Sequence, residues 1–157
     1  MKLAERFPGL SFEVQDMEEV ITGLEVPKHL ASRFKYRAHN IFQEQPVKNA
    51  DAYYLSQILH NWPDKYCRRI LENIIPALKP GAKVLVCERI LPTSPHDPTY
   101  RIVSEFDLQM FVCFNAKERS LGEFEKIFMS TDQRFKRGEV YKSRNGDFCI
   151  YEAVWSP

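Results

Sequence analysis

Glycine, concentrated charge and long apolar runs are all scarce in this sequence. Only six of its 157 residues are glycine, and no two of them stand in the G-x-G spacing of phosphate-binding turns. Lys and Arg number 22 and Asp and Glu 21, so the formal net charge of +1 shows no basic excess for nucleic acid or a membrane surface. No apolar run is long enough to cross a bilayer, and the N-terminus lacks the apolar core of a secretory signal. Neither nucleic acid nor a membrane is therefore an expected partner.

The cysteines give no sign of a metal site or of disulfides. Cys67, Cys87, Cys113 and Cys149 are far apart, and no C-x-x-C pair is present. This spacing does not provide the ligand pairs of a zinc site, so no metal is predicted. In a chain of this size without a secretory signal, we expect buried free thiols rather than two disulfides. A reducing, cytoplasmic location is predicted.

The pattern that is present is typical of a single α/β domain. Hydrophobic residues make up 44% of the chain, which is enough for a core. Strands are predicted over residues 10–15, 35–39, 52–59, 83–88, 135–143 and 147–155. Helices are predicted over residues 16–24, from Pro63 to Leu78, over 102–114 and over 120–129. Two of them open with capping boxes, Asp16 with Glu19 and Ser120 with Glu123.

Residues 52–88 indicate the topology. Strand 52–59 is nearly continuous in apolar character, as expected for a strand buried on both faces. The next helix begins at Pro63 and is stopped by Lys79-Pro80-Gly81. Its predicted apolar stripe consists of Cys67, Ile70, Leu71, Ile74, Ile75 and Leu78. Strand, helix and strand at this spacing form a βαβ unit, whose two strands are parallel. Asn145-Gly146 predicts a final antiparallel hairpin, so the expected fold is a doubly wound, mostly parallel α/β sheet.

Three side chains are candidates for acid–base chemistry. His60 follows strand 52–59, and Glu88 ends the next strand of the βαβ unit, so both are expected at one edge of the sheet. Glu118 lies in the loop before the Ser120 helix. Two carboxylates beside one imidazole would orient the ring and raise its basicity. The alternative is structural, with a histidine satisfied by backbone groups at a strand–helix junction and two solvated surface glutamates.

Asp16 and Trp62 also have two interpretations each. Asp16 either caps a helix or, at the carboxyl end of its strand, binds ribose hydroxyls of a nucleotide. Trp62 either belongs to the core or faces a flat ligand.

The segment DAYYLSQILHNWPDKYCRRILENIIPALKPGAKVLVCERILP, residues 51–92, resembles the plant- and fungal-type O-methyltransferases that use S-adenosylmethionine. The similarity includes the His-x-Trp-x-Asp core formed by His60, Trp62 and Asp64, the Lys79-Pro80-Gly81 turn and the Glu88 strand. The segments FEVQDMEEV, AHNIF, DLQMFVCFNAKERS and IYEAVW resemble further blocks of that family, in the same order. The resemblance covers essentially the whole chain.

The resemblance implies a Rossmann-like class I methyltransferase fold, with His60 as the catalytic base between Glu88 and Glu118. It implies that the cofactor is S-adenosyl-L-methionine and that the partner is a small hydroxylated acceptor, an aromatic or polyketide-like metabolite. The cofactor site would consist of Asp16 at the ribose, Asn40 and Ile41 beside the adenine, and Trp62. Met110 and Asn115 would line the acceptor pocket.

The chain also departs from the family pattern. Members carry a glycine-rich loop after the first core strand and a helical N-terminal dimerisation domain, so we expect residues 1–157 to be a partial catalytic domain without these parts. Strand edges left unpaired invite contact with a second chain, which makes a homo-oligomer possible. The alternative to an active enzyme is a silent remnant, or a fragment that needs a complementary chain. A dehydrogenase of the same fold class also requires the glycine fingerprint and gives no reason for His60.

Overall fold

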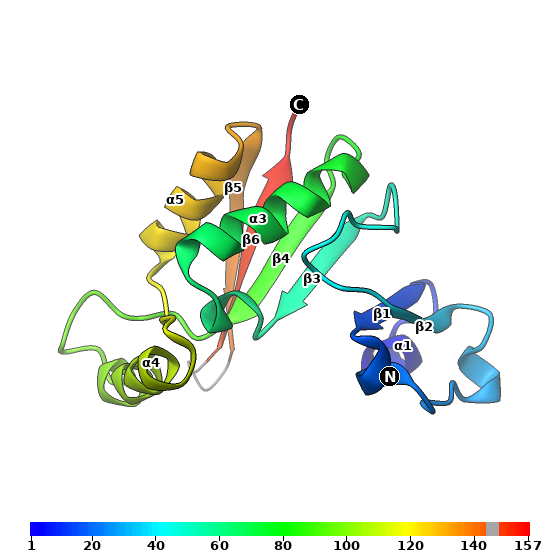
Figure 1. Ribbon diagram of the computed structural model, residues 1–157, viewed down its shortest axis with the longest axis horizontal. Coiled ribbons are helices and arrows are strands. Elements are labelled where there is room, and N and C mark those ends of the chain that lie inside the picture. Colours follow the sequence, from blue (N-terminus) through cyan, green and yellow to red (C-terminus); the bar gives the residue numbers. More distant parts are fainter. Residues whose placement is uncertain (144–147) are drawn as a thin grey trace. The chain divides into compact units, whose positions relative to one another are not determined.

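The computed structural model describes residues 1–143 and 148–157 (Figure 1). The chain divides into two compact units, residues 1–45 and 46–157, and each is described by itself. Among the described residues, no helix combines the length and the apolar character that crossing a bilayer requires.

The first unit is a small parallel pair of strands with short helices. Its elements are α1 (Lys2–Arg6), β1 (Phe12–Asp16), α2 (Glu18–Ile21), a 3₁₀ helix (Lys28–Leu30) and β2 (Phe34–Ala38). β1 and β2 run parallel in register from Phe12↔Phe34 to Asp16↔Ala38. A small core of Ala4, Leu30 and Phe34 lies against Phe12, Val26 and Tyr36. Both strands therefore direct their carboxyl ends to the same edge.

The predicted capping box at Asp16 and Glu19 is wrong. α2 begins at Glu18 with Met17 as its N-cap, and no side chain caps it. Asp16 is the last residue of β1, and its Oδ1 accepts the N–H of Met17 at 2.8 Å. The strand continues one residue further than the pattern indicates, so Asp16 lies one position before the cap and cannot reach the third helical N–H.

The second unit is a four-stranded mixed sheet with helices. It contains β3 (Ala52–Ser56), a 3₁₀ helix (Leu59–Asn61), α3 (Asp64–Ile74), a 3₁₀ helix (Ile75–Ala77), β4 (Lys83–Glu88), α4 (Tyr100–Phe114), α5 (Leu121–Thr131), β5 (Phe135–Lys142) and β6 (Cys149–Trp155). The strand order is β3-β4-β6-β5. β3 and β4 are parallel, as the βαβ prediction requires, whereas β6 is antiparallel to both β4 and β5. The predicted turn at Asn145-Gly146 lies outside the described residues.

α3 and α5 lie side by side on one face of this sheet (Figure 1). Side chains that point to them are buried, and Tyr151 of β6 stacks on Phe124 and Phe128 of α5 at 5.9 and 5.5 Å. The prediction that strand 52–59 is buried on both faces is wrong, because Tyr53 and Leu55 are buried whereas Tyr54 between them is 52% exposed. Within the second unit, α3 and α5 lie on the face to which Tyr53 and Leu55 point.

The helices of the second unit follow their sequence signals closely, whereas the helix predicted over residues 16–24 is limited to Glu18–Ile21. α3 begins after Pro63, one position later than predicted, and buries Cys67, Ile70, Leu71 and Ile74. Gly81, which follows the last 3₁₀ turn, has a φ of +78°, a conformation that glycine adopts without strain. α5 opens with the predicted capping box, in which Ser120 Oγ accepts the N–H of Glu123 and Glu123 accepts the N–H of Ser120. All four cysteines are free, but Cys113 on α4 is exposed, contrary to the prediction of buried thiols.

Candidate active site

His60 lies in the turn between β3 and α3, where the main chain leaves the sheet. β3 ends at Ser56, and Gln57 adopts a left-handed φ of +53° that redirects the chain into the Leu59–Asn61 3₁₀ helix. The N–H of Gln57 donates to the carbonyl of Cys87 on the neighbouring strand at 3.0 Å, which fixes the turn to β4. His60 is only 7% exposed. The histidine is therefore a buried side chain rather than a surface one.

The side chain of Glu88, the last residue of β4, binds the backbone of this turn. Its Oε1 accepts three successive N–H groups, those of Ile58 at 3.2 Å, Leu59 at 2.6 Å and His60 at 3.1 Å. The side chain is completely buried, and its Oε2 has no hydrogen-bond partner within the described residues. Oε1 thus holds the backbone of the turn, and Oε2 is a buried acceptor.

Glu118 contacts the imidazole itself. Its Oε1 lies 3.0 Å from His60 Nδ1, and the side chain is 1% exposed. The N–H of Glu118 donates to Asp107 Oδ1 of α4 at 2.9 Å, which holds the backbone of the loop in place. The structure therefore brings Glu88 and Glu118 together at His60, one on its backbone and one on its ring.

The environment shifts the pKa of two of these groups. Burial lowers the pKa of His60, but the hydrogen bond to Glu118 and the charges of Glu118 and Glu88 outweigh burial and the opposing charge of Arg89, so the net shift is upward. Burial raises the pKa of Glu88 to about 7, although the positive charge of His60 and the backbone N–H groups act against it. His60 and Glu88 can consequently gain or lose a proton near neutral pH.

Arg119 completes the cluster and was not predicted from the sequence. It is fully buried, and its guanidinium donates to the carbonyls of Leu59 and Trp62 at 2.8 and 2.7 Å. It also forms an ion pair with Asp64 Oδ1 at 2.8 Å. The only sequence signal was its place beside Glu118. Its burial could not be predicted, because it depends on contacts with residues far away in the chain.

The other candidates of this unit lie around the same turn or on α4. Trp62 is half-buried, with its ring 5.9 Å from that of Tyr66. Met110 is buried on α4, the helix that contacts the His60 turn. Asn115 is exposed and ends α4 in a left-handed conformation with φ +51°.

Asp16, Asn40 and Ile41 belong to the first unit and gather at one edge of its sheet. Asp16 ends β1, and its carbonyl accepts the N–H of His39, the residue that follows β2. Asn40 comes next and its Oδ1 accepts the N–H of Phe42 at 2.9 Å. Asp16 is exposed and Asn40 and Ile41 are half-buried, so these side chains are accessible to a ligand at the carboxyl ends of two parallel strands.

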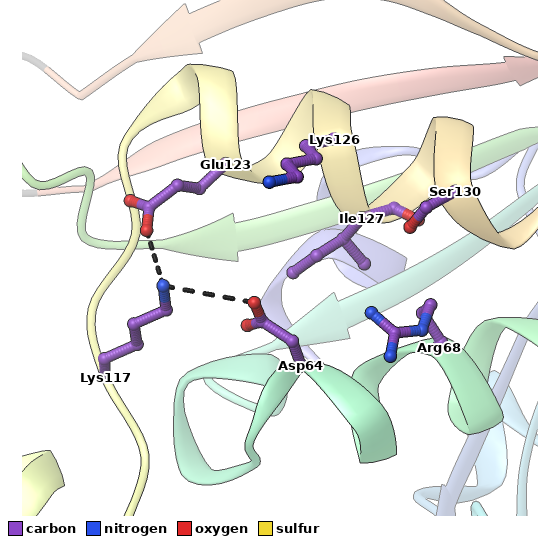
Figure 2. Close-up of a pocket in the computed structure, with 7 residues that line it drawn as sticks. All are labelled: Asp64, Arg68, Lys117, Glu123, Lys126, Ile127 and Ser130. Atoms are coloured by element: carbon purple, nitrogen blue, oxygen red, sulfur yellow. Dashed lines mark hydrogen bonds and ion pairs between the residues drawn. The ribbon is translucent and has the colours of Figure 1, made fainter.

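A hollow of about 160 Å³ lies between α3 and α5, and His60 is not among the residues that line it (Figure 2). Figure 2 shows Lys117 between Asp64 and Glu123, with its Nζ 2.5 Å from Glu123 Oε1 and 4.0 Å from Asp64 Oδ2. The hollow is smaller than the roughly 300–1,000 Å³ of typical ligand sites. Its charged lining is therefore best described as the outer side of the network that includes Asp64.

The comparisons with known proteins agree on one family. A family model of the O-methyltransferase domain matches residues 1–134. O-methyltransferase gsfB of Penicillium aethiopicum is 40% identical over 99% of this chain, and chlorophenol O-methyltransferase of Trichoderma longibrachiatum is 36% identical over 99%. The solved structure of CalO1, a methyltransferase in calicheamicin biosynthesis in its SAH-bound form, is 25% identical over 98% of this chain with a TM-score of 0.85.

The chain belongs to the O-methyltransferase family, and its fold is that of the class I methyltransferases, as the resemblance implied. It spans 37% of the length of gsfB, 34% of the chlorophenol enzyme and 44% of CalO1.

Proposed function

We propose that this chain carries the acid–base centre of an O-methyltransferase that moves a methyl group from S-adenosylmethionine to a hydroxyl of a small aromatic or polyketide-like metabolite. The observation that carries the proposal is the buried contact between His60 Nδ1 and Glu118 Oε1, at 3.0 Å. Within a family of methyltransferases, a histidine oriented by one carboxylate and held through its backbone by another is suited to the role of general base.

The proton chemistry follows from this arrangement. When neutral His60 donates Nδ1–H to Glu118, its Nε2 is the free acceptor nitrogen. A phenol has a pKa of about 10 and imidazole about 6.5, so His60 takes the proton only as the oxygen attacks. The imidazolium that forms lies beside two carboxylates, Glu118 and Glu88, which stabilise its charge. The resting base must be neutral, and the raised pKa of His60 therefore favours reaction above neutral pH.

The residues of the first unit fit the nucleoside end of the cofactor. Asp16 offers an exposed carboxylate for ribose hydroxyls, and Asn40 with Ile41 offers an amide and an apolar side chain for adenine. Trp62 is a further proposed cofactor residue, taken from the family resemblance. When bound, S-adenosylmethionine supplies a methyl group activated by a sulfonium. CalO1 with SAH bound supports this cofactor assignment by similarity.

The acceptor class is proposed from the relatives and from α4. Chlorophenol O-methyltransferase, by its name, acts on a phenol, which is the kind of hydroxyl that a histidine base serves. Met110 and Asn115 are the proposed acceptor-lining residues. We further propose that residues 1–157 act as part of one catalytic domain, in the cytoplasm, and that its strand edges favour a homo-oligomer.

The test is methyl transfer from isotope-labelled S-adenosylmethionine to a panel of phenols by wild type, His60→Gln and His96→Gln. His60→Gln should lower turnover by about 10²- to 10⁴-fold with nearly unchanged cofactor affinity, because it removes the base but not the binding groups. His96, an exposed histidine of the loop before α4, provides the matched control. Equal turnover in His60→Gln and wild type would mean that the base is misassigned. Absence of turnover in wild type would favour the alternative, a silent remnant or a fragment that needs a complementary chain.

A further inference from the structure

We propose that Arg119 is a positioning residue that sets the orientation of His60 through hydrogen bonds to the backbone of the turn that carries it. This inference rests on the proposed role of His60 as base. Arg119 is fully buried, and its guanidinium has hydrogen bonds to Leu59, Trp62 and Asp64. These acceptors come from both sides of His60 in the sequence. One rigid, planar group therefore fixes the entry and the exit of the turn at once.

The peptide group between Leu59 and His60 is held at both of its poles. Its N–H donates to Glu88 Oε1 at 3.1 Å, and its carbonyl accepts Arg119 Nη1 at 2.8 Å. Because a peptide group is planar, hydrogen bonds from a carboxyl group at one end and a guanidinium at the other leave it little freedom to rotate. The side chains of Glu88 and Arg119 thus hold the direction in which the His60 side chain leaves the backbone.

The imidazole ring of His60 is held by the residue next to Arg119. Glu118, which binds His60 Nδ1, immediately precedes Arg119. The carbonyl of Arg119 accepts the N–H of Leu91 at 2.9 Å, just beyond the end of β4. Two adjacent residues therefore place the imidazole relative to its own backbone. Arg119 is held by the segment that follows β4, and Glu118 is held by Asp107 of α4.

Asp64 balances the buried guanidinium. Arg119 Nε and Nη2 both donate to Asp64 Oδ1, at 3.1 and 2.8 Å. Figure 2 shows the outer part of the network, where Lys117 lies between Asp64 and Glu123. A purely structural role would make this ion pair the important contact, whereas a positioning role depends on the two carbonyl contacts. The two roles therefore predict different effects for variants of Arg119 and Asp64.

The test compares Arg119→Lys with Asp64→Asn. Lysine keeps the charge but is a point donor and cannot reach Leu59, Trp62 and Asp64 with the geometry of the fork. Asparagine keeps an oxygen acceptor for Arg119 and leaves both carbonyl contacts in place. We expect Arg119→Lys to lower kcat by about 100-fold with KM for S-adenosylmethionine nearly unchanged, and Asp64→Asn to lower kcat much less. A similar loss in the two variants would overturn the proposal in favour of charge balance.

An NMR titration of the His60 ring adds a readout that does not require turnover. The hydrogen bond to Glu118 contributes to the raised pKa of His60, so Arg119→Lys should move that pKa downward, whereas Asp64→Asn should not. Unchanged His60 titration in a folded Arg119→Lys variant would refute the positioning role. If wild type is inactive but the titrations differ as expected, the positioning role holds and the proposed function fails.

Hydrogen exchange in wild type provides a measurement that survives a failure of Arg119→Lys to fold. The His60 N–H should exchange as slowly as the amides of β4, because its peptide group is held at both ends. Exchange at the rate of a solvent-exposed turn would show that the turn is not fixed and would overturn the proposal.

Discussion

Glu88 Oε1 accepts the N–H of Leu59 at 2.6 Å, so the end of one strand holds the turn that follows its neighbour. The same oxygen accepts the N–H groups on either side, while Oε2 is buried without a partner among residues 1–143 and 148–157. A carboxylate placed in this way is strongly bound in its charged form at one oxygen and poorly solvated at the other. The balance decides its protonation state, and burial prevails, because the pKa is raised to about 7.

The first prediction concerns stability as a function of pH. The pKa of Glu88 is about 7 in the folded protein and 4.5 as an ordinary value, so the folded state binds a proton that the unfolded chain releases between these values. The free energy of unfolding should therefore fall as the pH rises from about 5 to about 7, by up to roughly 3 kcal/mol. The raised pKa of His60 acts with the same sign, since its contribution is lost as the pH rises through the folded value. Urea unfolding at a series of pH values measures the effect.

Glu88→Gln is the variant that isolates this contribution. Glutamine keeps an oxygen for the three N–H groups but has no proton to exchange, so the variant should lose less stability than wild type over the same pH range. Glu72→Gln, on the exposed side of α3, is the control and should follow the wild-type profile. A wild-type profile in Glu88→Gln would show that another group causes the pH dependence.

The second prediction concerns the thiols. Cys113 is exposed on α4, whereas Cys67 is fully buried and its burial raises its pKa to about 12. A thiol reagent at neutral pH should modify Cys113 quickly and Cys67 only on unfolding, because reaction requires an accessible thiolate. Cys113→Ser should remove the fast phase, and mass spectrometry after partial labelling assigns it. A fast phase that persists in this variant would show that a thiol other than Cys113 is the most accessible one.

The third prediction concerns the close approach of β5 and β6. A Cβ on Gly138 would lie 2.8 Å from Cγ of Glu152, a buried residue in ion contact with Lys83 at 2.8 Å. Gly138→Ala should therefore lower the free energy of unfolding by about 1–3 kcal/mol. Gly122→Ala is the control, since nothing lies within 4 Å of a Cβ there and alanine favours the helix. Denaturant unfolding compares them, and an equal stability of both variants would exclude the steric conflict.

A double variant checks the cause. If the clash with Glu152 is the reason, Gly138→Ala should cost less in a Glu152→Ala background than in wild type. Additive effects of the two substitutions would show that the penalty has another origin.

Local signals in the sequence were sufficient where neighbours in the chain determine the structure. Lys83–Glu88 was predicted as a strand with the bounds that the structure shows, because an apolar run bounded by a glycine turn needs no distant partner to be recognised. The Ser120 box was confirmed for the same reason, since its two partners are three residues apart. The Asp16 box has the same spacing but failed, because pairing of β1 with β2 extends the strand through Asp16.

Contacts between distant segments account for what the sequence did not show. His60 and Glu118 stand far apart in the chain, and the place of Glu118 in a loop suggested that they meet without fixing which atoms come together. Arg119 carries no pattern that separates a buried charge from a solvated one. The alternation of buried and exposed residues in β3 depends on which face the helices cover, and a continuous apolar run does not contain that information.

The last prediction concerns cofactor binding by the 157-residue chain. Asp16, Asn40 and Ile41 provide groups for the nucleoside end, but the sequence has no G-x-G turn whose backbone N–H groups would approach the other end of the cofactor. We therefore expect the chain to bind S-adenosylmethionine more weakly than micromolar, that is, with less than about 8 kcal/mol of binding free energy, in isothermal titration calorimetry. Asp16→Ala should reduce whatever binding is detected, whereas Glu18→Ala, an exposed neighbour on α2, should not. A micromolar dissociation constant would refute the need for the glycine turn, and equal binding by Asp16→Ala and wild type would remove Asp16 from the proposed site.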